Sequence, residues 1–320
     1  MSSKCLYCYK ETTDDSVFHA ACALDFFGDS DIPKLPYDLS EMTVLAKNVV
    51  ERSIAVPGVQ AKLSMSLVEK SYENTDKRLT VVGALGGNYI FKPPSEDFME
   101  MPANEHITMR IAEAFGIRVV PSSLIRLQSG ELSYITKRID RTNEGAKIHM
   151  LDMFQITEAF DKYRGSMEKI GKALNEYSSN TLLDKLYFFE LALFSFLTGN
   201  NDMHLKNFSM IFSDAGWVLA PAYDLLNVAI VNPDDTEELA LTIEGKKKKL
   251  KREHFDRLGD GLELTPKQIK GVYNRLKKNK TKALQLINKS FLSAEMKEKY
   301  IELLEERYGV IFKGTNLRRV

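Results

Sequence analysis

One stretch decides the fold class, and it runs Thr198-Gly199-Asn200-Asn201-Asp202-Met203-His204-Leu205-Lys206-Asn207-Phe208-Ser209. It follows a strongly apolar helical pattern and precedes a short strand pattern, which predicts a loop. Asp202 and Asn207 are separated by four residues, and a tight loop can aim two such side chains into one site. Phosphoryl transfer needs a carboxylate to orient the attacking hydroxyl, and carboxylate or amide oxygens to hold magnesium. The loop fits this chemistry, with Lys206 placed to neutralise charge on the transferring phosphate.

A second carboxylate for the metal is expected at Asp224, which follows a pair of short strand patterns. Protein kinases carry their Asp-Phe-Gly magnesium ligand in the same place in the order of elements. An isolated Asp-x4-Asn pattern is common by chance, and an N-capping Asp or a turn Asn would explain each residue alone. The position of Asp224 after the strand pair and the helix–loop–strand context of Asp202 favour phosphoryl transfer over that simpler explanation.

A lysine that could reach the phosphates of ATP stands at Lys92, at the end of an apolar strand pattern. An exposed lysine at a strand end explains the same residue equally well. The loop over residues 56–62 lies directly before a predicted strand and contains a single glycine, Gly58. One glycine is weak evidence for a phosphate-binding loop.

The order of hydrophobic patterns indicates an α+β fold and is compatible with the bilobal protein-kinase type, for which it is weak evidence by itself. Alternation and short apolar runs predict strands in the first half at 63–68, 79–85, 88–92, 122–127 and 132–138, with a helix at 103–115. In the second half, strands are expected at 208–212 and 217–219, and helices at 181–197, 253–259, 266–278, 281–290 and 293–307. We expect a small Cys/His unit at 1–28, a strand-rich lobe at 29–145 that begins with a connector, and a helical lobe at 146–320.

A further set of motifs occurs in one order over residues 50–230. The motifs are Gly58-Val59-Gln60-x-Lys62, Phe91-Lys92-Pro93, Asn104-Glu105, Arg138-x-Asp140-Arg141, Asp152-x-x-Gln155, Asp202-x-His204-x-Lys206-Asn207-Phe208 and Tyr223-Asp224. In this set and this order the chain resembles the HipA family of bacterial toxin kinases. The resemblance implies a bilobal serine/threonine protein kinase that uses ATP and magnesium.

The resemblance also assigns roles to residues of this chain. Asp202 would be the catalytic base, and Asn207 and Asp224 would hold magnesium. The nucleotide would be contacted by Lys92 and His204, by Gly58, Gln60 and Lys62 of the first motif, and by Lys137 and Ile139 in a hinge segment against adenine. Known family members phosphorylate aminoacyl-tRNA synthetases, which halts translation and growth. They work with a small helix-turn-helix antitoxin, so contact with DNA would be indirect.

The chain departs from the family pattern in three ways. The positions where family members often carry an autophosphorylated serine are Ala55 and Pro57, and Ser53 is not a clean match. Lys137 and Ile139 replace an acidic and an aromatic hinge residue, so adenine contacts are expected to differ. The chain also resembles a short form without the N-terminal subdomain, whose role would fall to a separate small protein.

All three cysteines lie near the N-terminus in the pattern Cys5-x2-Cys8-x10-His19-x2-Cys22. Two such pairs joined by a short loop have the ligand types and spacing of a tetrahedral zinc site. We expect a structural Zn²⁺, because four protein ligands leave no open position for chemistry. The alternative is the remnant of a zinc site that has lost its metal. An odd, small number of cysteines argues against a disulfide framework.

Composition limits the class of partner. The 44 basic and 44 acidic side chains cancel, so there is no general positive field to attract nucleic acid. The run Lys246–Arg252 contains six basic residues and could contact RNA, DNA or an acidic protein, although such runs are usually solvated loops. No apolar stretch approaches the length of a membrane span, and we expect a cytoplasmic protein.

Three functions remain in competition. The first is a protein kinase that acts as a growth-inhibiting toxin, with a synthetase-like target. The second is a kinase-like scaffold with weak or no activity that works in a repressor complex, and the altered glycine loop keeps it open. The third is a small-molecule kinase, against which the motifs outside the catalytic loop count. Growth arrest on expression would distinguish a toxin from both rivals.

Overall fold

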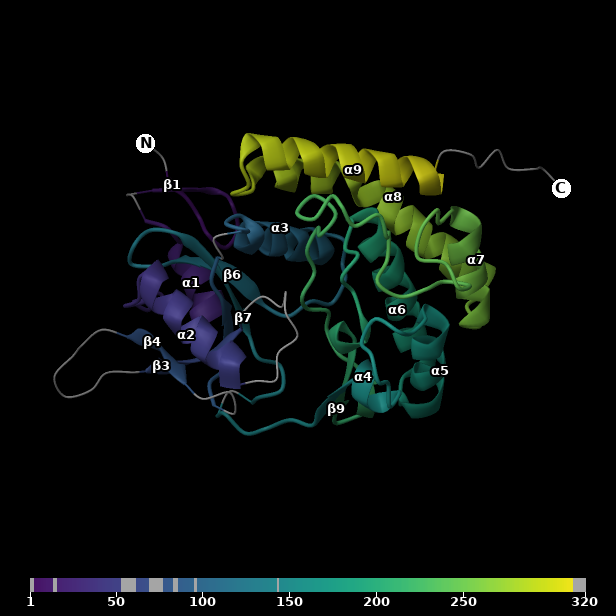
Figure 1. The fold of residues 1–320 in the computed structure, drawn as a ribbon, viewed down its shortest axis with the longest axis horizontal. Coiled ribbons are helices and arrows are strands. Elements are labelled where there is room, and N and C mark those ends of the chain that lie inside the picture. Colours follow the sequence, from purple (N-terminus) through teal and green to yellow (C-terminus); the bar gives the residue numbers. More distant parts are fainter. Residues whose placement is uncertain are drawn as a thin grey trace. The chain divides into compact units, whose positions relative to one another are not determined.

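The computed structural model describes residues 3–13, 16–52, 62–68, 77–82, 86–94, 97–142 and 144–312. The chain divides into two compact units (Figure 1). The strand-rich unit comprises Met1–His106, Val120–Lys147 and Lys289–Phe291. The helical unit comprises Ile107–Val119, Ile148–Asn288 and Leu292–Val320.

An antiparallel sheet of five described strands forms the centre of the strand-rich unit, in the order β4-β3-β5-β7-β6. Its strands are β3 (Leu63–Val68), β4 (Arg78–Val82), β5 (Tyr89–Lys92), β6 (Ser122–Arg126) and β7 (Leu132–Lys137). The central pair β5 and β7 is in register with Phe91 opposite Ile135 and Lys92 opposite Tyr134. The five strands predicted in this unit are confirmed, and where the structure describes both the predicted and the observed boundary the two differ by at most one residue.

The first 52 residues contribute a short hairpin, β1 (Ser3–Lys4) with β2 (Glu11–Thr12), and two helices, α1 (Ala20–Phe27) and α2 (Leu39–Arg52). The expectation of a connector after residue 28 was wrong for α2. Its start is fixed by a capping box, in which the Glu41 N–H donates to the Asp38 carboxylate and the Asp38 N–H donates to Glu41, both at 2.9 Å. This start signal is written in the sequence as Asp-x-x-Glu and was overlooked beside the prolines.

Helix α3 (Met101–Ala114) contains residues of both units, with Met101–His106 in the strand-rich one. Its buried positions Ala103, Ile107 and Ile111 recur at helical spacing, as predicted. The helix ends before Gly116, whose φ of +85° lies in the left-handed region that terminates helices at low cost.

The helical unit is built around α6 (Thr181–Leu197), which coincides with the predicted helix. The other helices are α4 (Met153–Ile156), α5 (Met167–Tyr177), α7 (Arg252–Gly261), α8 (Pro266–Lys289) and α9 (Ala294–Phe312). A small antiparallel sheet, in the order β10-β9-β8, adds β8 (Met150–Asp152), β9 (Ser209–Ser213) and β10 (Gly216–Leu219). Every residue of α6 from Phe188 to Leu197 is buried, which explains why this helix is apolar on all sides.

One prediction in this unit was wrong, because the two helices expected at 266–278 and 281–290 form the single helix α8. The polar residues at the supposed break are accommodated by α9. Asn279 is buried, and Lys280 pairs with Glu305 of α9. The Tyr308 hydroxyl of α9 also donates to the Leu276 carbonyl at 2.8 Å, so α8 and α9 lie against each other (Figure 1).

Among the described residues, no helix combines the length and the apolar character that a membrane crossing requires. The longest, α8, carries a series of lysines along its exposed face.

The core around α6 gives a first testable prediction. Replacing the fully buried Phe194 by Ala removes a ring that packs edge-on against Phe115, with centroids 5.7 Å apart. The change should lower the free energy of unfolding by about 3–5 kcal/mol. Urea unfolding can be followed by the fluorescence of the single tryptophan, Trp217, which lies in the same unit. Leu182→Ala on the same helix is the matched control, because Leu182 is 65% exposed and should change stability by less than about 0.5 kcal/mol. Equal effects of the two changes would contradict the assigned core.

Candidate functional site

The predicted catalytic loop begins where α6 ends, and backbone hydrogen bonds hold its shape. Gly199 has φ +69°, and a Cβ there would lie 2.6 Å from the Asn227 Oδ1, so the turn requires glycine. The His204 N–H donates to the Asp202 carbonyl at 2.8 Å. The Asn207 side-chain amide donates to the same carbonyl at 3.0 Å. That bond fixes which side of the Asn207 amide carries nitrogen, and it turns the Oδ1 oxygen away from the Asp202 carbonyl.

The segment that carries Asp224 is joined to this loop through Tyr223. The Tyr223 hydroxyl donates to the Lys206 carbonyl at 2.9 Å and shares a hydrogen bond with the Ser209 hydroxyl. Burial raises the pKa of Tyr223, so its hydroxyl stays protonated and remains a donor. Asp224 itself has φ +59°, a conformation that a residue other than glycine adopts at a cost and that is frequent at functional sites. Asn207 and Asp224, predicted as a magnesium pair, therefore come from segments that one tyrosine links.

Lys206 is exposed, with its ammonium 4.8 Å from the centroid of the Phe154 ring on α4. Asp152, at the start of the same helix, has a pKa raised by burial, and the nearby Lys206 charge and the Gln155 N–H oppose that shift. The Asp152 carboxylate accepts from the Gln155 N–H at 2.8 Å, and the Gln155 side chain accepts from the Asp152 N–H. The motif Asp152-x-x-Gln155 is thus a capping box that builds α4 beside Lys206.

Sequence reasoning missed Tyr163, which lies far upstream of the catalytic loop. Its hydroxyl donates to the Asp202 Oδ1 at 2.8 Å, and its ring meets the His204 ring edge-on at 5.1 Å between centroids. The Leu205 N–H donates to the Lys162 carbonyl at 3.1 Å, which attaches the Tyr163 segment to the loop. Burial and the Asp202 charge raise the pKa of Tyr163, which keeps the donating proton in place. The segment has no periodicity or motif from which this contact could be foreseen.

In the strand-rich unit, Lys92 forms a buried ion pair that was also not foreseen. Its ammonium lies 2.6 Å from the Glu105 Oε1 of α3, and the two side chains are 3% and 1% exposed. The Tyr134 ring of β7 lies 5.4 Å from the same ammonium. Protein kinases use a strand lysine paired with a helix glutamate to hold the phosphates of ATP. The alternative interpretation of Lys92 as an exposed strand-end residue was wrong, because the side chain is buried. The signal for Glu105 was present as an acidic residue in an apolar helix pattern thirteen positions after Lys92.

The hinge segment begins at the last residue of β7. The Lys137 ammonium lies 5.8 Å from the Phe26 ring centroid and 3.4 Å from the Asp25 carbonyl. Burial lowers the pKa of Lys137, and the Asp25 charge opposes that shift. Next to it, the Arg138 guanidinium donates two hydrogen bonds to the Asp140 carboxylate, at 2.8 and 2.7 Å, and one to the Ser64 hydroxyl at 3.1 Å. The Arg-x-Asp motif therefore fastens the end of β7 to β3.

The predicted site residues fall into two groups, one in each unit. Lys62, Lys92, Lys137 and Ile139 lie in the strand-rich unit, and Asp202, His204, Lys206, Asn207 and Asp224 lie in the helical unit. Lys62 is exposed directly before β3, Ile139 is half-buried, and His204 is buried. Gly58 and Gln60 lie outside the described residues, as do the regulatory positions 53, 55 and 57.

The run Lys246–Arg252 has acidic and hydroxyl partners within its own unit. Lys247 pairs with Glu237 at 3.1 Å, Arg252 pairs with Asp256 at 3.5 Å, and Lys248 donates to the Thr236 hydroxyl at 3.5 Å. These contacts are those of a solvated surface loop, which was the simpler explanation of the run.

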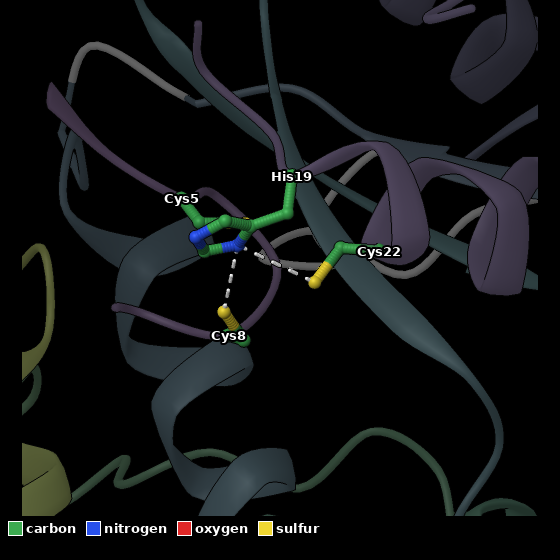
Figure 2. A group of neighbouring side chains, drawn as sticks. All are labelled: Cys5, Cys8, His19 and Cys22. Carbon is green, nitrogen blue, oxygen red and sulfur yellow. Dashed lines mark hydrogen bonds between the residues drawn. The ribbon is translucent and has the colours of Figure 1, made fainter. Parts of the chain in front are cut away.

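The Cys/His pattern at the N-terminus forms a cluster in space (Figure 2). The ligand atoms of Cys5, Cys8, His19 and Cys22 all lie within 4.8 Å of one another. Burial raises the pKa of the Cys5 thiol, but backbone N–H groups from Cys8, His19 and Tyr7 outweigh it and bring the value to about 7. Burial and the neighbouring Cys5 raise the pKa of Cys22 to about 12. The four residues were predicted to converge, and the structure brings them together.

Comparison with known proteins agrees with this architecture. The family model of the HipA-like C-terminal domain matches residues 54–284. The Sinorhizobium fredii protein Y4dM, a putative kinase by name, is 32% identical over 253 residues, which are 73% of this chain and 59% of that protein. The serine/threonine-protein kinase toxin HipA of Shewanella oneidensis is 26% identical over 212 residues, 60% of this chain and 47% of that protein. The chain thus spans about three fifths or less of the length of these curated relatives.

A solved structure shares the fold. It is that of the Shewanella oneidensis MR-1 toxin–antitoxin system of HipA, HipB and operator DNA, with a TM-score of 0.65 and 21% identity over 82% of this chain and 70% of that chain. The predicted α+β, kinase-like fold is confirmed by this likeness. The family match covers more than half of the chain, so the chain belongs to the family of HipA-like C-terminal domains.

Proposed function

We propose that the chain is a serine/threonine protein kinase that transfers phosphate from ATP-Mg²⁺ to a protein hydroxyl. The observation that carries the proposal is the link through Tyr223 between the Asp202–Asn207 loop and the segment of Asp224. Oxygen ligands are what magnesium prefers, and the Asn207 amide orientation and the Asp224 carboxylate supply them. The buried pair of Lys92 and Glu105 supports the same function from the strand-rich unit.

In the proposed reaction, Asp202 orients the substrate hydroxyl and accepts its proton as the oxygen attacks the terminal phosphorus of ATP, and the bond to the bridging oxygen breaks to release ADP. Asn207 and Asp224 hold magnesium, which when bound neutralises charge on the phosphate oxygens. Lys92, held by Glu105, contacts the phosphates, and the exposed Lys206 stabilises charge on the transferring group. His204 contacts ATP, and Lys137 and Ile139 border adenine. Gly58, Gln60 and Lys62 complete the nucleotide site by resemblance to the family.

We further propose a toxin role with a helix-turn-helix antitoxin as partner, and an aminoacyl-tRNA synthetase as the class of target. The support is family membership and the likeness in fold to a HipA that was solved together with HipB and its operator DNA. Contact with DNA would then run through the antitoxin.

The test of the activity is transfer of radiolabelled phosphate from ATP-Mg²⁺ into proteins of a bacterial lysate. Asp202→Asn should lower the transfer about 10²- to 10⁴-fold, the range contributed by a general base. Asp214→Asn is the matched control, because Asp214 is an exposed turn residue between β9 and β10 and should leave transfer unchanged. A labelled band that depends on Asp202 would identify the substrate by its mass. Absence of Asp202-dependent label in lysate and on the chain itself would favour the inactive scaffold or a small-molecule substrate.

The buried ion pair gives a second prediction, on stability and activity together. Glu105→Gln leaves the Lys92 charge buried without its counter-ion, which should cost about 3–5 kcal/mol of unfolding free energy and reduce transfer. The double change Lys92→Met with Glu105→Gln should recover much of the stability and none of the activity. Glu113→Gln is the control on the same helix, because Glu113 is half-exposed. If Glu105→Gln and Lys92→Met each left urea unfolding unaltered, the pair would not anchor β5 to α3.

Tyr163 gives a third prediction, as a residue that positions Asp202. Tyr163→Phe removes the hydrogen bond to the Asp202 Oδ1 and keeps the ring against His204. Turnover should fall roughly tenfold to a hundredfold, as expected when a catalytic group loses its orientation, while KM for ATP changes little. Tyr177→Phe, at an exposed tyrosine of α5, is the control. A change in KM for ATP without a change in turnover would contradict the positioning role.

A further inference from the structure

Two distances within the Cys/His cluster match those of a four-coordinate metal site, and all its ligand atoms lie within 4.8 Å of one another. His19 Nδ1 lies 3.4 Å from the Cys8 sulfur and 3.7 Å from the Cys22 sulfur (Figure 2). In a tetrahedral zinc site with the usual bond lengths, a nitrogen and a sulfur ligand are about 3.6 Å apart and two sulfurs about 3.8 Å. The cluster therefore needs only small shifts to accept the ion.

The orientation of His19 favours metal binding. Its Nε2 lies 2.9 Å from the Glu11 carbonyl oxygen, which can only accept, so Nε2 carries the ring proton. In the neutral ring the lone pair is then on Nδ1, the atom that faces the two sulfurs. Metal-binding histidines are commonly fixed in this way by a backbone carbonyl. Although His19 is the N-cap residue of α1, its side chain makes no capping hydrogen bond. Its Nδ1 instead faces the sulfurs of Cys8 and Cys22.

The first two cysteines are presented by a tight turn after β1. The Cys5 N–H donates to the Lys10 carbonyl at 2.9 Å, and the Tyr9 N–H donates to the Cys5 carbonyl at 3.0 Å. Tyr9 has φ +64°, the left-handed conformation that reverses the chain directly after Cys8.

We propose that Cys5, Cys8, His19 and Cys22 bind one structural Zn²⁺ ion that holds α1 on strands β5 and β7 of the strand-rich unit. Three sulfurs and one imidazole fill a tetrahedral shell, so the ion has no open position and takes no part in chemistry. The ion joins the β1–β2 hairpin to α1, in a segment of under 30 residues that is too short to form a core of its own.

The claim that the ion holds α1 on β5 and β7 follows from the residues that α1 contacts. Phe26 and Phe27 pack on Tyr89 of β5, with ring centroids 6.0 and 6.3 Å apart. Phe26 also lies under the Lys137 ammonium at the end of β7. Strand β5 ends in Lys92, so α1 supports both strands whose last residues the proposed function assigns to ATP. This claim rests on the proposed function, whereas the metal site does not.

Metal analysis of the purified full chain tests the site without any activity. We expect one zinc per chain by mass spectrometry of the metal, and a large loss in Cys8→Ser and in His19→Ala. His149→Ala is the matched control, because this exposed histidine lies outside the cluster and should keep the zinc. No metal, bound iron, or unchanged zinc in both cluster variants would overturn the site.

Cobalt replacement guards against variants that lose metal only because they misfold. The Co²⁺-loaded chain should show a thiolate-to-cobalt absorption band and the visible spectrum of a tetrahedral ion. Cys22→Ser should retain a tetrahedral spectrum with a weaker thiolate band, since one of three sulfurs is removed. A spectrum without thiolate character would overturn the proposed ligand set.

The support of α1 is tested by comparing the zinc-bound chain with the chain after chelation. Chelation should raise hydrogen exchange in residues 20–27 and in β5, and should weaken binding of a non-hydrolysable ATP analogue at least several-fold. Bound zinc with unchanged exchange and unchanged analogue affinity would overturn the supporting role and leave the metal site standing. A zinc-bound chain with protected α1 that binds no analogue would contradict the proposed kinase function instead.

Discussion

The helical unit depends on the complete burial of α6 from Phe188 to Leu197, because the loop with Asp202 begins where this helix ends. A helix that is apolar on all sides has no exposed face and must be covered all round. Phe194 packs on Phe115, Phe188 packs on Phe208, and Phe196 packs on Phe255 of α7. A loop held at such a helix end has little freedom to move, and its polar side chains can be kept in one arrangement by a few hydrogen bonds.

In the helical unit the buried side chains around α6 are mostly apolar, whereas the strand-rich unit buries the two charged side chains of Lys92 and Glu105. Taking Lys92 and Glu105 out of water is expensive, and their attraction offsets the cost only at short range with good geometry. A buried ion pair is therefore weak evidence for stability. Here the pair fixes the direction of the Lys92 side chain at the end of β5. The register of β5 against β7, with Lys92 opposite Tyr134, fixes where along the sheet the Lys92 side chain starts.

The sequence predicted most elements because their patterns are long and periodic, and it predicted that the Cys/His residues come together because their spacing is that of metal ligands. The roles assigned to the Asp202–Asn207 loop stay predictions. Sequence reasoning failed where one contact decides the outcome. The hydrogen bond of Tyr163 to Asp202 joins residues 39 apart, and no local pattern indicates it. The Asn279 and Lys280 pair looked like a helix break because the partner helix α9 is invisible to a local pattern. The capping box at Asp38 and Glu41 is present in the sequence as Asp-x-x-Glu, but the nearby prolines led to the prediction of a connector.

The lysine at position 137, in the predicted hinge segment, has a local physical explanation. An acidic residue in place of Lys137 would put a carboxylate against the Asp25 carbonyl and over the negative face of the Phe26 ring. A lysine is favoured there for both reasons, and its stem lies on apolar surface while burial lowers its pKa. Both partners belong to α1, which carries Cys22 in its first turn. Helix α1 thus contacts Lys137 through its second half and contributes Cys22 to the Cys/His cluster from its first turn. A change in the cluster that shifts α1 is therefore expected to move the contacts of Lys137 as well.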